Sequence, residues 1–341
     1  MTKILFIGNI QREIPPTGGG AQAKNQLFLN FLQERFGDVA YYDTWHKNRI
    51  VSLLIICLRI IFSPNKKTIL SLSFDGVYLL SKILTIIRIK RNIYYWVVGG
   101  DIVDKMKNNK EITLKYLNCF SKIIVEATYI ANGLKILGIK NIKVIPNFKK
   151  IDYIPNKAKR CENKFRFVYL GRLIEEKGVG LIVEAIRQLE GKNFEVDFYG
   201  SLSSKFSIEY FDKIDLKNVC YKGFLDLQNK KNYDILASYD VMIFPTYFLG
   251  EGFPGVIIDA FIAGLPVITT DFHANPEIIV DGKNGILIPP KHLDKLKEVM
   301  NDFICGKYDL EFMQNEALSS AKYYDIHNVL SNSIFTELDI L

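Results

Sequence analysis

Two basic side chains stand five positions apart in residues 171–178, whose sequence is GRLIEEKG. The segment lies between a predicted strand over 165–170 and a predicted helix over 180–190. Arg172 and Lys177 would therefore lie at the carboxyl edge of a sheet, where a guanidinium fork and an ammonium group can bind phosphate oxygens. A departing diphosphate gains negative charge, which fixed cations would stabilise. A solvated turn with two unrelated charges fits the same spacing.

A second segment, residues 251–259, places two carboxylates around a glycine-rich turn. Its sequence EGFPGVIID begins with Glu251 and ends with Asp259, where a helix over 256–263 is predicted. Exposed amides at a helix start can bind a diphosphate. Glu251 could accept hydrogen bonds from sugar hydroxyls, and Asp259 could accept them from a ribose. A capped helix after a polar turn is the alternative interpretation.

Three consecutive glycines, Gly18, Gly19 and Gly20, separate the first predicted strand from the first long helix. Glycine lets the backbone approach a ligand closely. The run matches neither the dinucleotide-binding fingerprint nor the P-loop. A flexible turn is an equally good interpretation of this run alone.

Alternating strands and helices must position these segments. Strands are predicted over 4–8, 39–42, 68–73, 92–98, 122–126 and 143–145, and after a polar linker over 149–163 the alternation resumes at residue 165. This pattern predicts α/β architecture with two parallel, doubly wound sheets, whose ligands bind at the carboxyl ends of the strands. We therefore expect Rossmann-like domains over 1–155 and 156–325, facing across a cleft. We expect a C-terminal helix over 326–341 to pack back on the first domain.

The net charge of +7 is unevenly distributed. Residues 1–155 carry 23 Lys and Arg against 10 Asp and Glu, a net of +13, and the remainder carries −6. Such an excess favours an anionic partner. We expect no nucleic acid, because the charges are dispersed and no recognition motif appears. A helix over 77–91, apolar with a basic end, suits an anionic bilayer surface, although an ordinary buried helix has the same pattern.

Metal and membrane-spanning classes are disfavoured by the sequence. The five cysteines and four histidines are scattered, so we expect reduced thiols and no metal site. The longest apolar stretch, residues 50–62, is interrupted by Arg59 and falls short of the ~20 residues of a membrane span. The N-terminus enters a strand rather than a signal peptide. We expect a cytoplasmic protein.

In order, the motifs of residues 143–290 resemble those of the retaining GT-B glycosyltransferases of family 4, the group 1 type. In the first half the resemblance is thinner and rests on the glycine run and residues 133–147. The ordered set comprises VIPN at 144–147, GR at 171–172 with Lys177, Gly223, Pro245, the 251–259 segment, AGLPVI at 263–268, NPE at 275–277 and DGKNG at 281–285.

The resemblance implies roles for single residues. Arg172 and Lys177 would bind the diphosphate of a nucleotide-sugar donor of UDP or GDP type, and Glu251 would contact the transferred sugar. No metal ion or other cofactor is implied, because cationic side chains and a helix start replace the metal. The amides of Phe253, Gly255 and Val256 would face the phosphates, Asp259 would hold the ribose, Gly18 to Gly20 would close near the phosphates, and Gly223 and Phe224 would lie near the base.

The sequence departs from the family pattern at two places. The family has Glu where this chain has Asp259, which is one methylene shorter. The family often has a His in the loop after the strand that ends near residue 98, and this chain has Gly99-Gly100-Asp101 there. What that His does near the transferred sugar must here be done by Asp101, by the backbone, or not at all.

The resemblance implies retaining transfer of a hexose-type sugar to a glycan acceptor. Together with the basic half, it suggests a lipid-linked acceptor at the inner face of a bacterial membrane, in capsule, O-antigen or exopolysaccharide assembly. A sugar-nucleotide epimerase on the same fold would need further acid/base carboxylates, which we do not identify. A non-catalytic sugar-nucleotide or glycan-binding subunit is disfavoured, because Arg172, Lys177 and Glu251 are all present.

Overall fold

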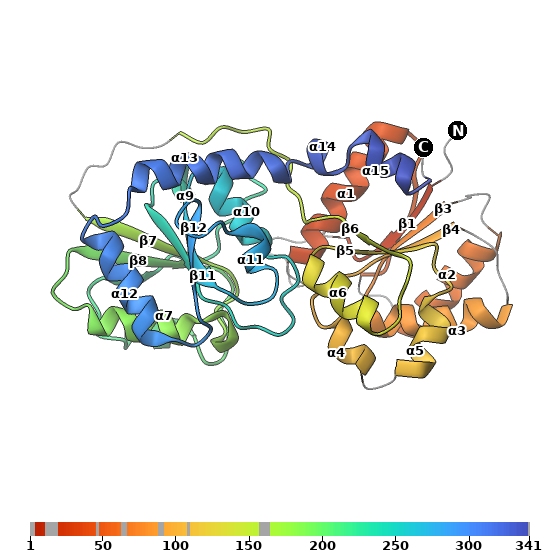
Figure 1. The fold of residues 1–341 in the computed structure, drawn as a ribbon, viewed down its shortest axis with the longest axis horizontal. Coiled ribbons are helices and arrows are strands. Elements are labelled where there is room, and N and C mark those ends of the chain that lie inside the picture. The colour runs from red at the N-terminus through yellow and green to blue at the C-terminus, as the bar shows by residue number, and fades with distance from the viewer. Residues whose placement is uncertain are drawn as a thin grey trace. The chain divides into compact units, whose positions relative to one another are not determined.

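The computed structural model describes residues 4–10, 20–45, 48–62, 67–87, 92–107, 110–156 and 164–339. The chain divides into two compact units (Figure 1). The first comprises Met1–Lys150, Gly250–Phe253 and Ile326–Leu341, and the second comprises Ile151–Leu249 and Pro254–Asp325.

The first unit contains a six-stranded parallel sheet in the order β2-β1-β3-β4-β5-β6. Parallel strands covered on both faces read as continuous apolar runs, and β1, with the sequence ILFIG, is buried throughout. The strands are β1 (Ile4–Gly8), β2 (Ala40–Asp43), β3 (Lys67–Ser71), β4 (Asn92–Trp96), β5 (Lys122–Val125) and β6 (Ile142–Val144).

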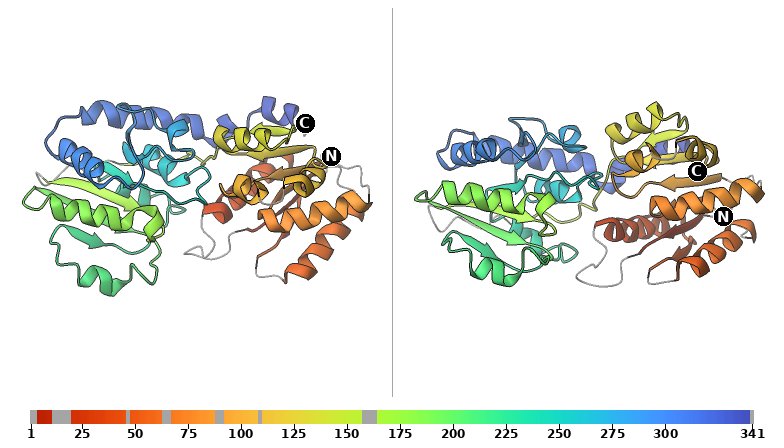
Figure 2. Two further views of the ribbon diagram at one scale, coloured as in Figure 1. Left: turned by 60° about the horizontal axis from the view of Figure 1, so that its bottom comes forward. Right: turned by 90° about the horizontal axis from the view of Figure 1, so that it is seen from below.

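Helices cover both faces of this sheet (Figures 1 and 2). One layer contains neighbouring helices that contact one another in the pairs α2–α3, α3–α5, α4–α5 and α4–α6. The helices of the unit are α1 (Gly20–Phe36), α2 (Arg49–Phe62), α3 (Phe74–Ile87), α4 (Ile102–Lys107), α5 (Lys110–Leu117), α6 (Thr128–Ile136), α14 (Ile326–Val329) and α15 (Asn332–Glu337).

The C-terminal segment is part of the core of the first unit. Phe335 of α15 stacks on Phe31 of α1 at 6.2 Å between ring centroids and meets Phe36 edge-on at 5.2 Å. The guanidinium of Arg35 lies 5.1 Å from the centroid of the Phe335 ring. These side chains join a cluster with Phe6 and other residues of the sheet, so the tail is held by burial of aromatic surface.

The second unit contains another six-stranded parallel sheet, in the order β12-β11-β10-β7-β8-β9. The prediction of two parallel, doubly wound sheets is thus confirmed. The strands are β7 (Phe165–Leu170), β8 (Phe194–Tyr199), β9 (Val219–Tyr221), β10 (Val241–Phe244), β11 (Val267–Thr270) and β12 (Gly285–Ile288).

Two groups of helices pack on this second sheet. In one group α7 contacts α12, and in the other α10 contacts both α9 and α13, as Figure 1 shows. The helical segments are η1 (Glu175–Lys177), α7 (Val179–Gln188), α8 (Ile208–Asp212), α9 (Asn232–Leu236), α10 (Gly255–Ile262), α11 (Asn275–Ile278), α12 (Leu293–Ile304), α13 (Leu310–Ala321) and η2 (Lys322–Tyr324).

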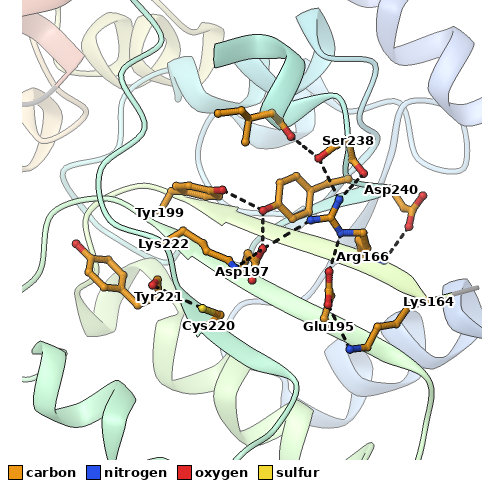
Figure 3. Close-up of polar contacts among 12 residues, drawn as sticks. Lys164, Arg166, Glu195, Asp197, Tyr199, Cys220, Tyr221, Lys222, Ser238 and Asp240 are labelled. Atoms are coloured by element: carbon orange, nitrogen blue, oxygen red, sulfur yellow. Dashed lines mark hydrogen bonds and ion pairs between the residues drawn. The ribbon is translucent and has the colours of Figure 1, made fainter. Parts of the chain in front are cut away.

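One face of the second sheet carries an unusual row of polar side chains (Figure 3). Register pairs Arg166 with Glu195, so both lie on the same face, and Arg166 Nε donates to Glu195 Oε1 at 2.7 Å. The burial of Glu195 opposes its charge, but hydrogen bonds from Arg166 and Lys164 outweigh it and lower the pKa of this carboxyl group. The pair therefore holds the amino ends of β7 and β8 together.

A buried carboxylate continues this row along β8. Tyr239 Oη donates to Asp197 Oδ2 at 2.6 Å, and Lys222 Nζ lies 3.8 Å from the same oxygen. Burial raises the pKa of Asp197, and the hydrogen bond from Tyr239 only partly offsets it. We attribute the row in Figure 3 to cross-strand packing, because its charges are satisfied by one another.

Because the Phe335 ring packs against other aromatic rings of the core, its removal should destabilise the protein strongly. Phe335→Ala should lower the free energy of unfolding by about 3–5 kcal/mol, because it removes a buried ring and leaves a cavity. Urea denaturation followed by circular dichroism measures this loss. Thr336→Ala, at an exposed position of the same helix, should change stability by less than about 0.5 kcal/mol. Equal losses in the two variants would show that α15 is not part of the core.

Candidate functional site

Arg172 and Lys177 lie beside one aromatic ring in the second unit. Arg172 follows β7 and is exposed, whereas Lys177 ends the turn η1 and has an exposed fraction of 8%. The Arg172 guanidinium carbon lies 5.4 Å from the centroid of the Phe248 ring, and Lys177 Nζ lies 5.5 Å from the same centroid. The structure therefore brings together the two cations that the sequence singled out, at the carboxyl edge of the sheet.

Gly178 permits this arrangement. Its φ of +83° is a left-handed conformation that side chains disfavour. A Cβ at this position would also lie 2.5 Å from Pro245 O. Glycine thus lets η1 pack directly on the loop that follows β10, and Tyr247 N donates to Glu176 O at 2.7 Å across the contact.

Phe248 is a site residue that sequence reasoning missed. It lies in the loop after β10, and its ring faces both cations, an attraction that the negative face of an aromatic ring supplies. Lys177 Nζ also lies 4.9 Å from the centroid of the Phe244 ring. A chain separation of more than 70 residues hides this proximity from any local motif. In the sequence, an aromatic residue close to Pro245 is the only signal that could have suggested this contact.

Asn275 stabilises the ends of the neighbouring strands β10 and β11 through hydrogen bonds. Its side chain is buried, and Nδ2 donates to Thr269 Oγ1 at 3.0 Å and to Thr270 O at 3.1 Å. Thr269 Oγ1 in turn donates to Phe244 O at 2.7 Å. The chain of hydrogen bonds ties the end of β11 to the end of β10, so Asn275 has a positioning role.

The helix α10 carries two of the predicted donor-binding features, which are the amides of its first residues and the carboxylate of Asp259. Pro254 precedes the helix without a side-chain cap, and the first turn contains Gly255 and Val256 and no acidic residue. Asp259, the fifth residue of α10, has an exposed fraction of 4%, and its Oδ1 accepts a hydrogen bond from Tyr233 Oη at 2.6 Å. Sequence reasoning missed Tyr233, which lies in α9.

Glu251 and Phe253 belong to a short segment that packs in the first unit. Tyr129 Oη donates to Glu251 O at 2.8 Å, and Gly100 N donates to Gly250 O at 3.2 Å. Asn147 Nδ2 donates to Phe253 O at 3.0 Å. The main chain of residues 250–253 is thus held by three hydrogen bonds, of which that from Tyr129 is to Glu251 itself, and Gly100 packs closely against Glu251 O.

The remaining predicted residues lie at separate places. Gly223 has a φ of +86° and accepts a hydrogen bond from Gly200 N at 2.9 Å, and Phe224 beside it is exposed. Asp101 forms an ion pair with Lys105 at 3.0 Å. Gly20 begins α1 and is exposed, whereas Gly18 and Gly19 lie outside the described residues.

The carboxyl edge of the first sheet carries a buried polar cluster that sequence reasoning missed. Lys24 of α1 forms an ion pair with Glu126 after β5, and both side chains are buried. Asn25 Nδ2 donates to Asn9 O at 3.0 Å, and Ser71 Oγ donates to Asn25 Oδ1 at 2.6 Å. Buried charge and amide groups are costly unless paired, so their position at this edge, where parallel sheets bind ligands, suggests a role beyond packing.

Residues 150–318 match the family model described as Glycosyl transferases group 1. This segment is a glycosyl transferases group 1 domain. It contains Arg172, Lys177, Gly223, Phe248 and Asp259, whereas Lys24 and Glu126 lie outside the matched residues.

Two bacterial proteins match about half of this chain. It is 26% identical over 182 residues to an uncharacterized 41.2 kDa protein in the cps region of Klebsiella pneumoniae, covering 53% of this chain and 48% of that protein. It is 26% identical over 196 residues to the capsular polysaccharide biosynthesis glycosyltransferase CapM of Staphylococcus aureus, covering 53% and 50%. The chain thus spans about half the length of these two relatives.

The likeness to solved structures extends over the whole chain. The crystal structure of Anabaena HepE in complex with UDP aligns with a TM-score of 0.76 at 17% identity, covering 99% of this chain and 100% of that one. The chain therefore has the two-domain α/β fold called GT-B.

The hydrogen bond between Tyr233 and Asp259 predicts a measurable penalty on its removal. Burial and the neighbouring carboxylate raise the pKa of Tyr233 well above its usual value, so its hydroxyl remains a donor at neutral pH. Tyr233→Phe should therefore lower the free energy of unfolding by about 1–3 kcal/mol at pH 7. Tyr210→Phe, at a half-buried tyrosine of α8, is the control in urea denaturation. A Tyr233→Phe variant as stable as the wild type would contradict the assignment.

Proposed function

We propose that the protein is a glycosyltransferase that moves a hexose-type sugar from a nucleotide-diphosphate sugar, of UDP or GDP type, to a glycan acceptor. The proposal rests on one observation: Arg172 and Lys177 both lie beside the Phe248 ring at the carboxyl edge of the second sheet, within the matched residues 150–318. The same unit contains the uncapped start of α10, and cationic side chains together with free amides at a helix start suit a diphosphate.

In the proposed reaction the bond between the sugar and the donor phosphate loosens first. The departing diphosphate gains negative charge, which Arg172, Lys177 and the amides of Gly255 and Val256 would stabilise. The acceptor hydroxyl would then attack the sugar from the face that the diphosphate leaves and pass its proton to a departing phosphate oxygen, so the anomeric configuration is retained. We assign no enzyme nucleophile.

Three further residues would hold the donor. The proposed partner of the sugar hydroxyls is the Glu251 carboxylate, because its main chain is fixed by Tyr129 and the Gly99-Gly100 turn. The Asp259 carboxylate would accept from the ribose while Tyr233 orients it. Phe224 is exposed and follows Gly223, so its ring could stack on the base.

We propose that the reaction needs no bound metal ion or other cofactor. Among the residues that the structure describes, no group of three or more His, Cys, Asp and Glu side chains is placed to hold a metal ion. The side chains of Arg172 and Lys177, with the amides at the start of α10, would supply the charge that a divalent ion supplies elsewhere.

For the acceptor we propose a lipid-linked glycan of bacterial surface polysaccharide assembly, reached from the cytoplasmic side of the membrane. Support comes from the basic first half and from relatives named for capsular polysaccharide biosynthesis. The polar cluster around Lys24 and Glu126 is the proposed acceptor edge, because paired polar groups at strand ends can bind sugar hydroxyls. In the described part of the chain, no helix has the length and apolar character required to cross a membrane.

Calorimetry with UDP, GDP, ADP and CMP tests the donor site without knowledge of the acceptor. The wild type should bind one nucleoside diphosphate best, and Arg172→Ala should weaken that binding about tenfold or more, on the order of 1.4 kcal/mol, because a charge-assisted contact is lost. Arg187→Ala, at an exposed arginine of α7, should bind like the wild type.

Three results would contradict the proposal. Folded wild-type protein that binds none of the four nucleotides would favour a glycan-binding subunit instead. Equal affinities of the Arg172 and Arg187 variants would place the phosphates away from the carboxyl edge of β7. Release of free sugar from a bound donor without any acceptor would favour an epimerase.

A further inference from the structure

The helix α2 exposes a row of large apolar side chains. Ile50, Leu54, Leu58 and Phe62 recur every four residues, and Val51 lies beside the first of them. Ile50 has an exposed fraction of 72% and Phe62 one of 76%. Residues four apart lie on one side of a helix, so these five side chains form a continuous outward face, which we call the α2 face.

The α2 face does not hold the helix on the protein. Ile56, Cys57 and Ile60 are buried and attach α2 to the first unit. The helix is therefore apolar on its outer side as well as on its inner side. Such a helix is expected in a membrane environment or within a core, and an exposed apolar patch of this kind marks an interaction site.

The adjoining helix α3 extends the apolar surface. Helices α2 and α3 contact each other, and Figures 1 and 2 show them side by side at the margin of the first unit. Leu79, Ile86 and Ile87 of α3 are exposed. The sequence pattern pointed to a helix over 77–91. The structure describes α3 over Phe74–Ile87, in which Leu80 and Leu84 are buried, and Arg88, Lys90 and Arg91 lie outside the described residues.

The charges around the α2 face are cationic. Arg49 and Arg59 are exposed on α2, and residues 49–62 contain no Asp or Glu. The Arg59 side chain extends from Tyr41 O, at 3.2 Å, to the Tyr42 ring, at 5.1 Å from its centroid. Asp75, at the start of α3, lies 3.7 Å from Lys105 Nζ. Apolar side chains flanked by arginines complement a surface of anionic lipid headgroups.

We propose that the α2 face, with the adjoining end of α3, docks on an anionic lipid bilayer. The apolar side chains enter the boundary between headgroups and acyl chains, and Arg49 and Arg59 contact the phosphates. Since α2 has 14 residues, it lies along the surface rather than across it. The inference deepens the proposed function, because it gives the enzyme a way to reach an acceptor carried by a membrane lipid.

Vesicle flotation tests the proposal without any nucleotide or acceptor. The full chain should float with vesicles of phosphatidylglycerol and phosphatidylcholine at low salt, and binding should weaken with salt. The double variant Leu54→Asp/Leu58→Asp should reduce the vesicle-bound fraction about tenfold, because two carboxylates would have to enter the headgroup region. Both positions are exposed, so its circular dichroism spectrum and its calorimetric nucleotide affinity should match those of the wild type.

Ile136→Asp is the matched control. Ile136 ends α6 in the same unit and has an exposed fraction of 81%, so this variant should float like the wild type. Failure of the wild type to float would overturn the proposal, as would equal losses in the control and the double variant. Sedimentation that shows a wild-type dimer dissociated by Leu54→Asp/Leu58→Asp, with no flotation, would assign the α2 face to a second copy of the chain. Flotation without nucleotide binding would refute the proposed function and leave the docking surface standing.

Discussion

The close approach of Gly178 to Pro245 is the constraint on which the candidate site depends. A Cβ at residue 178 would collide with Pro245 O, and the turn Glu175–Lys177 would then be displaced from the loop after β10. Lys177 would lose its position over the Phe244 and Phe248 rings. A lysine ammonium that is largely removed from water must be compensated by neighbouring groups with negative or partly negative charge. The Phe244 and Phe248 rings contribute to this compensation.

Both units bury polar groups that are costly to remove from water. In the first unit these are Lys24 and Glu126, and in the second the buried pair is Tyr233 and Asp259. Apolar side chains would serve packing better at such positions, so conflicts between local energetics and the observed residues indicate function. The pair Arg166–Glu195 differs, because it lies at the amino ends of β7 and β8, away from the edge where parallel sheets bind ligands.

The sequence predicted the two parallel sheets well, because buried parallel strands are short apolar runs that end at glycine, as β7 and β8 do. It also predicted that Arg172 and Lys177 follow one strand. It could not predict Phe248 or Tyr233, because their partners lie far away along the chain and only tertiary packing brings them together. The outward face of α2 was missed for a related reason: an apolar run does not reveal which of its sides is covered.

The most direct measurement is a crystal structure of the full chain with the nucleoside diphosphate that calorimetry selects. We predict electron density for the diphosphate within hydrogen-bonding distance of Arg172, Lys177 and the first amides of α10, and density for the ribose near Asp259. Density for the diphosphate elsewhere on the protein, with Arg172 and Lys177 still packed on Phe248, would contradict the central claim.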